Sequence, residues 1–297
     1  MGRPMVANLI SAGFELTLWN RTPSKAAYFQ NTAGIALSPA QAIADADVVI
    51  TMLENGAVVD DVLVAQGVLD ACKPGTLVID MSSIPPATAK SHGQYCVERG
   101  LDYLDAPVSG GTVGAEQATL TIMVGGDKAV FEKAKKVFRV LGRSTYIGPT
   151  GTGQITKLAN QAIVGITIGA VSEAMLLAAK GGADPVAVRE ALNRGFASSR
   201  ILDLHGQRMI DRNFVPGATC RVQLKDLRTI LDEARAEGLT LPLSQRVYDE
   251  YLSLAAAGFE DVDHSGLLLE LERMNQTKLN SEPDQLPNSM KDGEGYA

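Results

Sequence analysis

The stretch from residue 151 to residue 182, GTGQITKLANQAIVGITIGAVSEAMLLAAKGG, decides the fold. The stretch begins with Gly-Thr-Gly and ends with Gly-Gly, and no charged residue lies between Lys157 and Glu173. Most of the circumference of a helix with this pattern must be buried. Roughly 26 helical residues would span about 40 Å. We therefore predict one long helix that leaves one domain and forms the spine of a second.

Lys157 is the only cation near the start of this helix. Asn160 and Gln161 follow it at spacings of three and four, so all three side chains share one helix face. A desolvated lysine beside an amide is a poor packing residue. We therefore predict a functional role for Lys157.

The overall charge excludes one class of partner. The chain has 297 residues, enough for about two domains, and a net charge of -7. No basic patch is present to neutralise phosphates, which argues against nucleic acid as a partner, although a local basic group could still bind one small anion.

The cysteines and the apolar runs bear on location. The three cysteines (Cys72, Cys96 and Cys220) are scattered and lack metal-ligand spacing. We expect reduced thiols in a cytoplasmic protein and no metal site. The most apolar run, 162–171, is about half of the ~20 residues that a membrane span needs, so no membrane partner is expected. The first four residues lead into a helical pattern and do not resemble a secretory signal.

The first half of the chain alternates strand patterns with helix patterns, which is typical of a doubly wound, mostly parallel α/β sheet. We assign residues 1–149 to this domain. Strands are predicted at 14–19, 48–52, 76–80, 101–105, 120–124 and 144–147, and helices at 5–12, 23–30, 39–45, 55–64, 85–99 and 127–141.

The second half, 150–279, contains no convincing strand pattern and is predicted to be an all-helical domain. The last residues, 280–297, are polar and rich in proline, glycine and acidic residues, so they are predicted to be a disordered tail. Helices are predicted at 185–194, 199–211, 221–237, 242–257 and 264–275 after the long one.

Ligands of doubly wound sheets bind beyond the carboxyl ends of the strands. Asn20, Arg21 and Thr22 follow the first predicted strand, where an acidic residue would hold the ribose of NAD. An arginine with hydroxyl groups at this position suits the 2′-phosphate of NADP. A solvated turn is an equally acceptable interpretation of this feature alone.

Ser109, Gly110 and Gly111 follow the strand predicted at 101–105. A hydroxyl and close backbone N–H groups at such a turn can bind a carboxylate. The pattern is weak by itself, because many turns contain Ser-Gly-Gly. The segment DMSS at 80–83 is ambiguous in the same way.

The histidines argue against one class of dehydrogenase. His92, His205 and His264 are the only three, and none follows a predicted strand in a way that suggests a histidine–carboxylate pair. A Tyr-x-x-x-Lys pair is also absent. If the chain is an oxidoreductase, Lys157 is the best candidate for the acid–base group.

Short segments spread along almost the whole chain resemble one known family. The sequence resembles the β-hydroxyacid dehydrogenases, the group that contains 3-hydroxyisobutyrate dehydrogenase, tartronate semialdehyde reductase and the glyoxylate/succinic semialdehyde reductases. The segments DRNF at 211–214 and DHS at 263–265 look most like the tartronate semialdehyde reductase branch. The matching segments are MGxxMxxN at 1–8, TML at 51–53, DMSS at 80–83, DAPVSGG at 105–111, KLAN at 157–160 and KDL at 225–227.

The resemblance implies a Rossmann-like domain joined by a long helix to an all-helical domain that forms homodimers or homotetramers. It implies that Lys157 is the catalytic acid–base group, helped by Asn160, and that Ser109, Gly110 and Gly111 bind the substrate carboxylate. It also implies NADP as the preferred cofactor, or NAD, and a small carboxylate substrate. The cofactor-binding residues would be Gly2, Asn20, Arg21, Thr22, Met52, Leu53, Ser83 and Lys225.

Two positions depart from the family pattern. Ala118 stands where the family has glycine, a change that could alter the local turn. Of the fingerprint Gly-x-Gly-x-x-Gly only the last glycine, Gly2, is present, and the preceding strand is missing. We therefore expect two neighbouring strands to lack a ladder partner and cofactor binding to be weak. About ten residues of apolar strand ending in Gly-x-Gly-x before Met1 are expected to raise both the melting temperature and the affinity for NADPH.

The sequence thus predicts a reductase of small 2- or 3-hydroxy acids and their semialdehydes, such as a tartronate semialdehyde reductase. Within the family, 3-hydroxyisobutyrate dehydrogenase and glyoxylate/succinic semialdehyde reductase remain alternatives. A cofactor-deficient, non-catalytic relative is an alternative of a different class. Imine reductases are a third, but that related group usually replaces the lysine.

Overall fold

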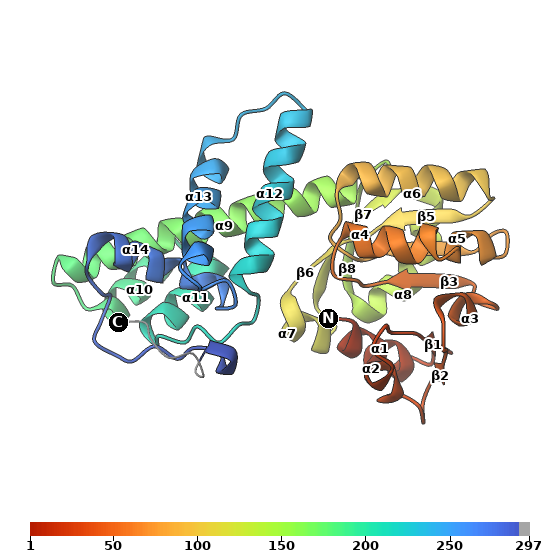
Figure 1. Ribbon diagram of the computed structural model, residues 1–297, viewed down its shortest axis with the longest axis horizontal. Helices are drawn as coiled ribbons and strands as arrows, with labels where there is room; N and C mark the ends of the chain where they lie inside the picture. Colours follow the sequence, from red (N-terminus) through yellow and green to blue (C-terminus); the bar gives the residue numbers. More distant parts are fainter. Residues whose placement is uncertain (291–297) are drawn as a thin grey trace. The chain divides into compact units, whose positions relative to one another are not determined.

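The computed structural model describes residues 1–290 and contains two compact units, Met1–Lys157 and Leu158–Ala297 (Figure 1). The predicted long helix is α9, Thr152–Lys180. We predicted the domain boundary after residue 149, just before this helix begins. The two compact units instead divide between Lys157 and Leu158, so the first six residues of the helix belong to the first unit.

A six-stranded mixed sheet forms the centre of the first unit, with the order β3-β4-β5-β7-β6 and β8 paired to β7. The inner strand β4 is apolar up to its last residue, Asp80, and is buried at every position, as expected for a strand covered on both faces. The sheet is less parallel than predicted, because β7 runs antiparallel to β5. The strands are β3 (Val48–Thr51), β4 (Leu77–Asp80), β5 (Asp102–Asp105), β6 (Val108–Ser109), β7 (Leu120–Gly126) and β8 (Gly142–Gly148).

Alternate residues of β4 point to opposite faces of the sheet and enter different cores. Leu77 and Ile79 belong to the core that contains residues of α1, α7 and α8. Val78 belongs to the core that contains residues of α3 to α6. Helices therefore cover both faces of the sheet (Figure 1). The helices are α1 (Gly2–Ser11), α2 (Pro23–Ala27), α3 (Pro39–Ile43), α4 (Gly56–Asp60), a π-helix (Asp61–Ala65), α5 (Val68–Ala71), α6 (Pro86–Glu98), α7 (Gly111–Glu116) and α8 (Lys128–Leu141).

A cavity separates the large sheet from a second, two-stranded sheet. The small sheet is a parallel pair, β1 (Thr17–Leu18) and β2 (Gly34–Ile35). Both β1 and β3 line the cavity, which has a volume of about 1300 Å³ and is also lined by α1. Within the described residues, β1 and β3 each pair with a strand on one side only. This is the interruption of the sheet that we expected from the sequence.

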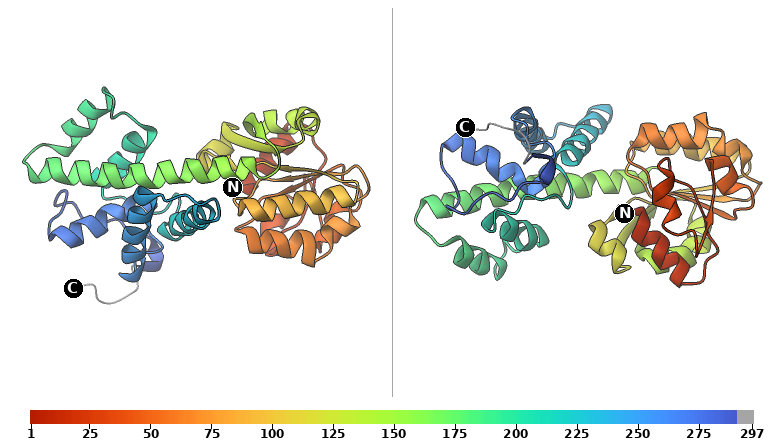
Figure 2. Two further views of the ribbon diagram at one scale, coloured as in Figure 1. Left: turned by 90° about the horizontal axis from the view of Figure 1, so that it is seen from above. Right: turned by 60° about the horizontal axis from the view of Figure 1, so that its bottom comes forward.

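In the second unit α9 passes among the shorter helices, which lie on both sides of it (Figure 2). By length and composition α9 could cross a membrane, and no other helix of residues 1–290 could. Ile168 and Met175 of α9 are nevertheless fully buried in the helical core. The other helices are α10 (Pro185–Asn193), α11 (Arg200–Ile210), α12 (Cys220–Ala236), α13 (Pro242–Ala256), a 3-10 helix (His264–Gly266), α14 (Leu267–Asn275) and a second 3-10 helix (Asn288–Met290).

The prediction of a disordered tail from residue 280 is wrong for residues 280–290, and residues 291–297 lie outside the described part of the chain. The fully buried Arg212 makes ion pairs with Glu272 and with Asp284 of this segment. Backbone hydrogen bonds join Gln285 to Arg212 and to Phe214. The polar composition of the segment misled the prediction, because a buried guanidinium needs carboxylate partners and one of them lies here.

Candidate active site

The carboxyl ends of β3 and β4 are joined by a buried polar network. The Oδ1 atom of Asp80 accepts hydrogen bonds from Thr51 Oγ1 at 2.7 Å and from Ser82 N at 2.9 Å. The hydroxyl oxygen of Ser82 in turn accepts from Leu53 N at 2.9 Å. The loop containing Leu53 is thereby held at the edge of the sheet where ligands of this architecture bind.

Four of the predicted cofactor residues, Gly2, Asn20, Met52 and Leu53, line the cavity between β1 and β3. At Gly2 an added Cβ would meet no atom within 4 Å, and Met1 gives α1 no side-chain cap. The N–H groups at the start of α1 are therefore open to an anionic group. A helix start of this kind can hold a phosphate group.

Arg21 and Thr22 lie on the exposed turn after β1 and do not line the cavity. Asn20 Oδ1 accepts a hydrogen bond from Thr22 N at 2.9 Å, which fixes this turn. Among the described residues Arg21 makes no ion pair with an acidic group, so its guanidinium can meet an anion. Ser83 is half-buried in the loop after β4.

The predicted carboxylate-binding turn begins at the last residue of β6. Ser109 is half-buried, and Gly110 and Gly111 have φ angles of +134° and +64°. These conformations favour glycine. A Cβ at Gly111 would project into open space, so the backbone is accessible there. The turn can therefore offer a hydroxyl and main-chain groups to a small anion.

Lys157 is half-buried in the second turn of α9. The first turn of this helix is anchored to the end of β5, because Asp105 accepts hydrogen bonds from Gly151 N and Gln154 N. Burial raises the pKa of Asp105 to about 6, against the opposing effect of these two hydrogen bonds. Our prediction of site residues missed both Asp105 and Gln154, although Asp105 opens the DAPVSGG segment.

The second unit joins two further predicted residues in one hydrogen-bonded chain. Asn160 Nδ2 donates to Gln161 Oε1 at 2.9 Å, and Gln161 Nε2 donates to Asp226 Oδ2 at 2.6 Å. Lys225 Nζ lies 2.9 Å from the other oxygen of Asp226. The structure thus links Asn160 to Lys225 through two residues that the prediction of site residues missed. The KDL segment at 225–227 was the available signal for Asp226.

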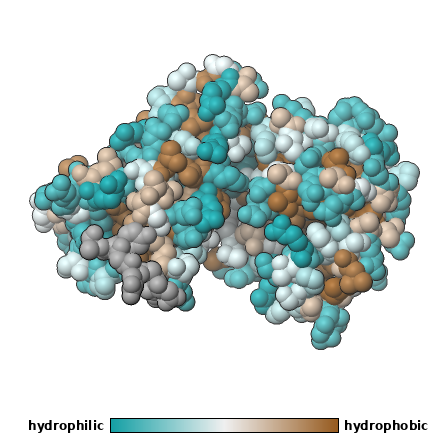
Figure 3. Space-filling view, in the orientation of Figure 1, coloured by the Kyte–Doolittle hydropathy of each residue, from teal (hydrophilic) through white to brown (hydrophobic). Residues whose placement is uncertain are grey.

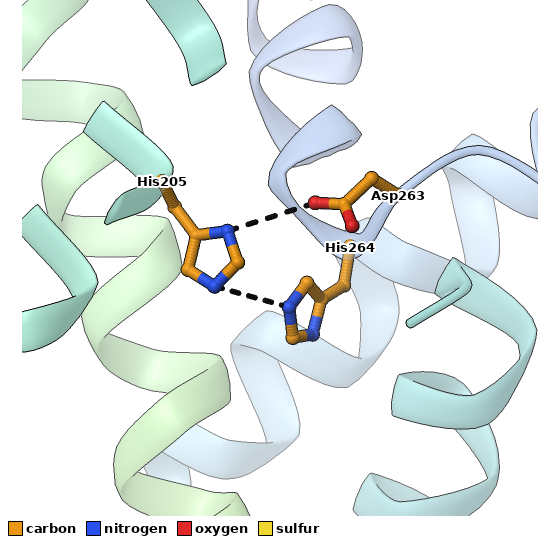
Figure 4. A group of neighbouring side chains, drawn as sticks. All are labelled: His205, Asp263 and His264. Atoms are coloured by element: carbon orange, nitrogen blue, oxygen red, sulfur yellow. Dashed lines mark hydrogen bonds and ion pairs between the residues drawn. The ribbon is translucent and has the colours of Figure 1, made fainter. Parts of the chain in front are cut away.

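His205, Asp263 and His264 form the one cluster of potential metal ligands among the described residues (Figure 4). The Nε2 atoms of the two histidines lie 3.2 Å apart, and His205 Nδ1 lies 3.6 Å from Asp263 Oδ1. The Asp263 carboxylate already accepts hydrogen bonds from Gly217 N, Ser265 N and Ser265 Oγ. A metal would have to displace these donors, so the cluster is better described as a hydrogen-bonded junction between the 3-10 helix and α11.

Comparisons with known proteins cover both units. Residues 1–148 match the NAD binding domain of 6-phosphogluconate dehydrogenase, and residues 151–271 match the NAD-binding domain of NADP-dependent 3-hydroxyisobutyrate dehydrogenase.

Individual relatives agree with these domain matches. The chain is 44% identical to 2-hydroxy-3-oxopropionate reductase of Escherichia coli (strain K12), over 94% of this chain and 96% of that one. It is 36% identical to a probable 3-hydroxyisobutyrate dehydrogenase-like protein of Arabidopsis thaliana, over 95% and 85% of the two chains. A solved structure of Mycobacterium tuberculosis 3-hydroxyisobutyrate dehydrogenase with L-serine superposes with a TM-score of 0.84 at 32% identity, over 91% and 95% of the two chains.

Proposed function

Because the chain belongs to the 3-hydroxyisobutyrate dehydrogenase family of NAD(P)-dependent oxidoreductases, we propose that it reduces the aldehyde of tartronate semialdehyde (2-hydroxy-3-oxopropionate) to an alcohol, giving 2,3-dihydroxypropionate. The observation that carries this choice of substrate is the 44% identity, over nearly the full length, to a reductase named for this reaction. The DRNF and DHS segments support the same branch.

In the proposed mechanism Lys157 donates a proton to the carbonyl oxygen of the substrate. When bound, the nicotinamide supplies the hydride for the carbonyl carbon. Ser109, Gly110 and Gly111 bind the substrate carboxylate, and their open, left-handed turn supports this role. Asn160 holds Lys157 or the substrate, from a position one helical turn after the lysine.

We also propose that the cofactor is NADP in preference to NAD. Arg21, Thr22 and Asn20 would bind the 2′-phosphate, and Gly2, Met52, Leu53, Ser83 and Lys225 the rest of the cofactor. The absence of an acidic partner for Arg21 in the described residues supports this choice, because a guanidinium binds a phosphate strongly through paired hydrogen bonds.

The helical unit is proposed to form a homodimer or homotetramer, and the protein to be cytoplasmic. Only 39% of the most apolar stretch of α9 is buried within the chain. Figure 3 shows apolar side chains on the exposed surface of the helical unit. A second copy of the chain would cover such surfaces. The three free cysteines support a reducing compartment.

The choice of substrate has one competitor that a specific observation favours. Residues 151–271 match a domain described for NADP-dependent 3-hydroxyisobutyrate dehydrogenase, so the semialdehyde of 3-hydroxyisobutyrate is the second candidate substrate. The candidates are distinguished by the rates of NADPH oxidation with four aldehydes. These are tartronate semialdehyde, the semialdehyde formed by oxidation of 3-hydroxyisobutyrate, glyoxylate and succinic semialdehyde. We expect the highest kcat/KM with tartronate semialdehyde.

The decisive variant is Lys157→Ala. Loss of the proton donor is expected to lower kcat about 100-fold or more, while the Kd for NADPH changes little. Lys180→Ala, which removes an exposed lysine at the other end of α9, is the matched control and should keep wild-type kcat. If Lys157→Ala keeps more than half of the activity, Lys157 is not the acid–base group.

A further inference from the structure

We propose that Asp105 is a positioning residue for Lys157: its buried carboxylate fixes the first turn of α9 and thereby the place of the lysine side chain. The inference rests on the proposed catalytic function of Lys157. It assigns to Asp105 a role in turnover that does not require contact with the substrate.

The carboxylate of Asp105 meets the start of α9 with both oxygens. Oδ1 accepts a hydrogen bond from Gly151 N at 2.8 Å, and Oδ2 accepts one from Gln154 N at 2.9 Å. Asp105 is completely buried at the end of β5. The first N–H groups of a helix have no partner within the helix, and they favour a negative charge. Asp105 therefore satisfies two of these groups with a charge of the favourable sign.

Two glycines close the space around this carboxylate. A Cβ at Gly125 would lie 2.5 Å from Asp105 Oδ1, and a Cβ at Gly153 would lie 2.8 Å from Asp105 Oδ2 and 2.5 Å from the carbonyl oxygen of Met123. The backbones of β7 and α9 therefore touch the carboxylate directly. The start of α9 has little room to shift along or away from the end of β5 while these contacts persist.

A second polar tie fixes the same helical turn. Gln154 is 1% exposed, and its side chain accepts a hydrogen bond from Ile84 N at 3.1 Å and donates one to Ser82 O at 2.9 Å. This links α9 to the loop of the proposed cofactor residue Ser83. Lys157 follows Gln154 by three residues, about 4.5 Å along the helix axis. Because both residues belong to one continuous helix, a displacement of its first turn would also displace Lys157.

The charge state of Asp105 matters for this anchor. Burial raises the pKa of Asp105 to about 6, and the two backbone hydrogen bonds and the nearby charge of Asp80 act on it in opposite directions. Protonation would turn one acceptor oxygen into an O–H group that faces an N–H group. The anchor is therefore expected to weaken as the pH falls through about 6. Asp80 on β4 and Tyr103 on β5 interact electrostatically with Asp105, and His92 on α6 interacts with Asp80. The Lys90 side chain of α6 lies close to Gly151, and β7 presents glycines here.

Asp127 provides a matched control for an ordinary helix cap. It caps α8 in the same unit, and its Oδ1 accepts hydrogen bonds from Ala129 N at 2.7 Å and Val130 N at 3.1 Å. Unlike Asp105 it is exposed, and α8 carries no proposed site residue. A general loss of capping should therefore affect Asp105→Asn and Asp127→Asn alike, whereas positioning of Lys157 involves Asp105 alone.

The test compares steady-state kinetics of wild type, D105N and D127N between pH 5 and 8. In D105N an NH2 group replaces one acceptor oxygen, so one N–H group of α9 loses its partner. We expect kcat of D105N to fall at least 10-fold at pH 7.5, with the Kd for NADPH within about threefold of wild type. Wild type should lose kcat below pH 6, and D105N should lack this acidic limb. D127N should keep the wild-type kcat and pH profile.

Two further measurements separate this inference from folding defects and from the proposed function. Gln154→Ala keeps both backbone hydrogen bonds to Asp105, so it should lower kcat and retain the acidic limb. Amide hydrogen exchange at residues 151–157 should accelerate in D105N and not in D127N, whether or not a substrate has been identified. Unchanged exchange there, or a D105N enzyme within twofold of wild-type kcat, overturns the positioning role. A wild-type protein that reduces none of the four aldehydes, but shows the exchange difference, overturns the proposed function instead.

Discussion

Three of the buried charged residues, Asp105, Asp263 and Arg212, have their charge matched by partners from other parts of the chain. Asp105 receives two backbone N–H groups, and Asp263 receives N–H groups from Gly217 and Ser265. Arg212, fully buried with a φ of +53°, is paired with two carboxylates. An unpaired charge at such positions would cost several kcal/mol. These residues therefore fix local geometry as well as carrying charge.

His264 predicts how stability depends on pH. Burial lowers its pKa to about 4, from an ordinary value of 6.5. Between these two values the unfolded chain binds more protons than the folded one, so the free energy of unfolding decreases as the pH falls from 6.5 to 4. The shift corresponds to a loss of about 3 kcal/mol.

The measurement is urea unfolding of wild type and His264→Gln at pH 7 and pH 5. The variant should lose less stability over this interval than wild type. Asp105, whose raised pKa acts in the opposite direction, contributes equally to both proteins and cancels in the comparison. Equal losses in the two proteins would show that the histidine is not buried in its neutral form.

Arg21 predicts the cofactor preference. A guanidinium paired with a 2′-phosphate is worth about 1.5–3 kcal/mol, or roughly 10- to 100-fold in affinity. We expect wild type to bind NADPH more tightly than NADH and Arg21→Asp to reverse this order in fluorescence titrations. Arg139→Asp makes the same change of charge on α8 and should leave the preference as it was. Equal affinities of wild type for the two cofactors would refute the assignment.

Among the secondary-structure elements, the end of α7 carries a conformational strain that the sequence had signalled. Ala118, the position where the resembling family has glycine, has a φ of +55°. The backbone N–H of Thr119 donates to Gly114 O at 2.8 Å, the hydrogen bond typical of a helix that ends in a left-handed residue. An alanine therefore occupies the left-handed position at which glycine is the usual residue.

Replacing Ala118 with glycine should therefore stabilise the protein. A left-handed conformation costs a residue with a side chain about 1–2 kcal/mol, and part of this gain is offset by the greater freedom of glycine when unfolded. We expect a net increase of about 1 kcal/mol in the free energy of unfolding. Ala115→Gly, inside the same short helix, should have the opposite sign. Denaturant unfolding measures both changes.

The longer elements could be predicted from the sequence because their apolar patterns repeat over several turns or fill a buried strand. The predicted segments 48–52, 76–80 and 101–105 correspond to β3, β4 and β5. Among the elements not predicted, β2, β6, α5 and α7 have six residues or fewer, and so short a segment shows no period. Asp105 was missed as an anchor for a related reason: its partners lie about 46 to 49 residues away, and sequence spacing carries no information on that contact.

For the whole molecule, the uncovered apolar surface of the helical unit predicts the oligomeric state. Ile163 and Leu177 of α9 are 66% and 77% exposed, and their separation of 14 residues places them on the same helix face. We expect wild type to be a dimer or tetramer and Ile163→Glu/Leu177→Glu to shift it toward the monomer in light-scattering chromatography. Leu37→Glu/Val97→Glu makes the same change at exposed positions of the first unit and should keep the oligomer. A monomeric wild type would refute the proposal.

The pair of short strands β1 and β2 has a consequence for the energetics of ligand binding. A parallel pair with two residues in each strand is marginally stable by itself, and these strands pair with no other strand of the described chain. The pair carries the turn with Arg21. A ligand that needs this turn binds only the molecules in which it is ordered, so the measured dissociation constant is the intrinsic constant divided by the ordered fraction. A substitution that only stabilises the strand pair would then tighten cofactor binding without contacting the cofactor. The measured cofactor affinity would therefore report the fraction of molecules in which this turn is ordered.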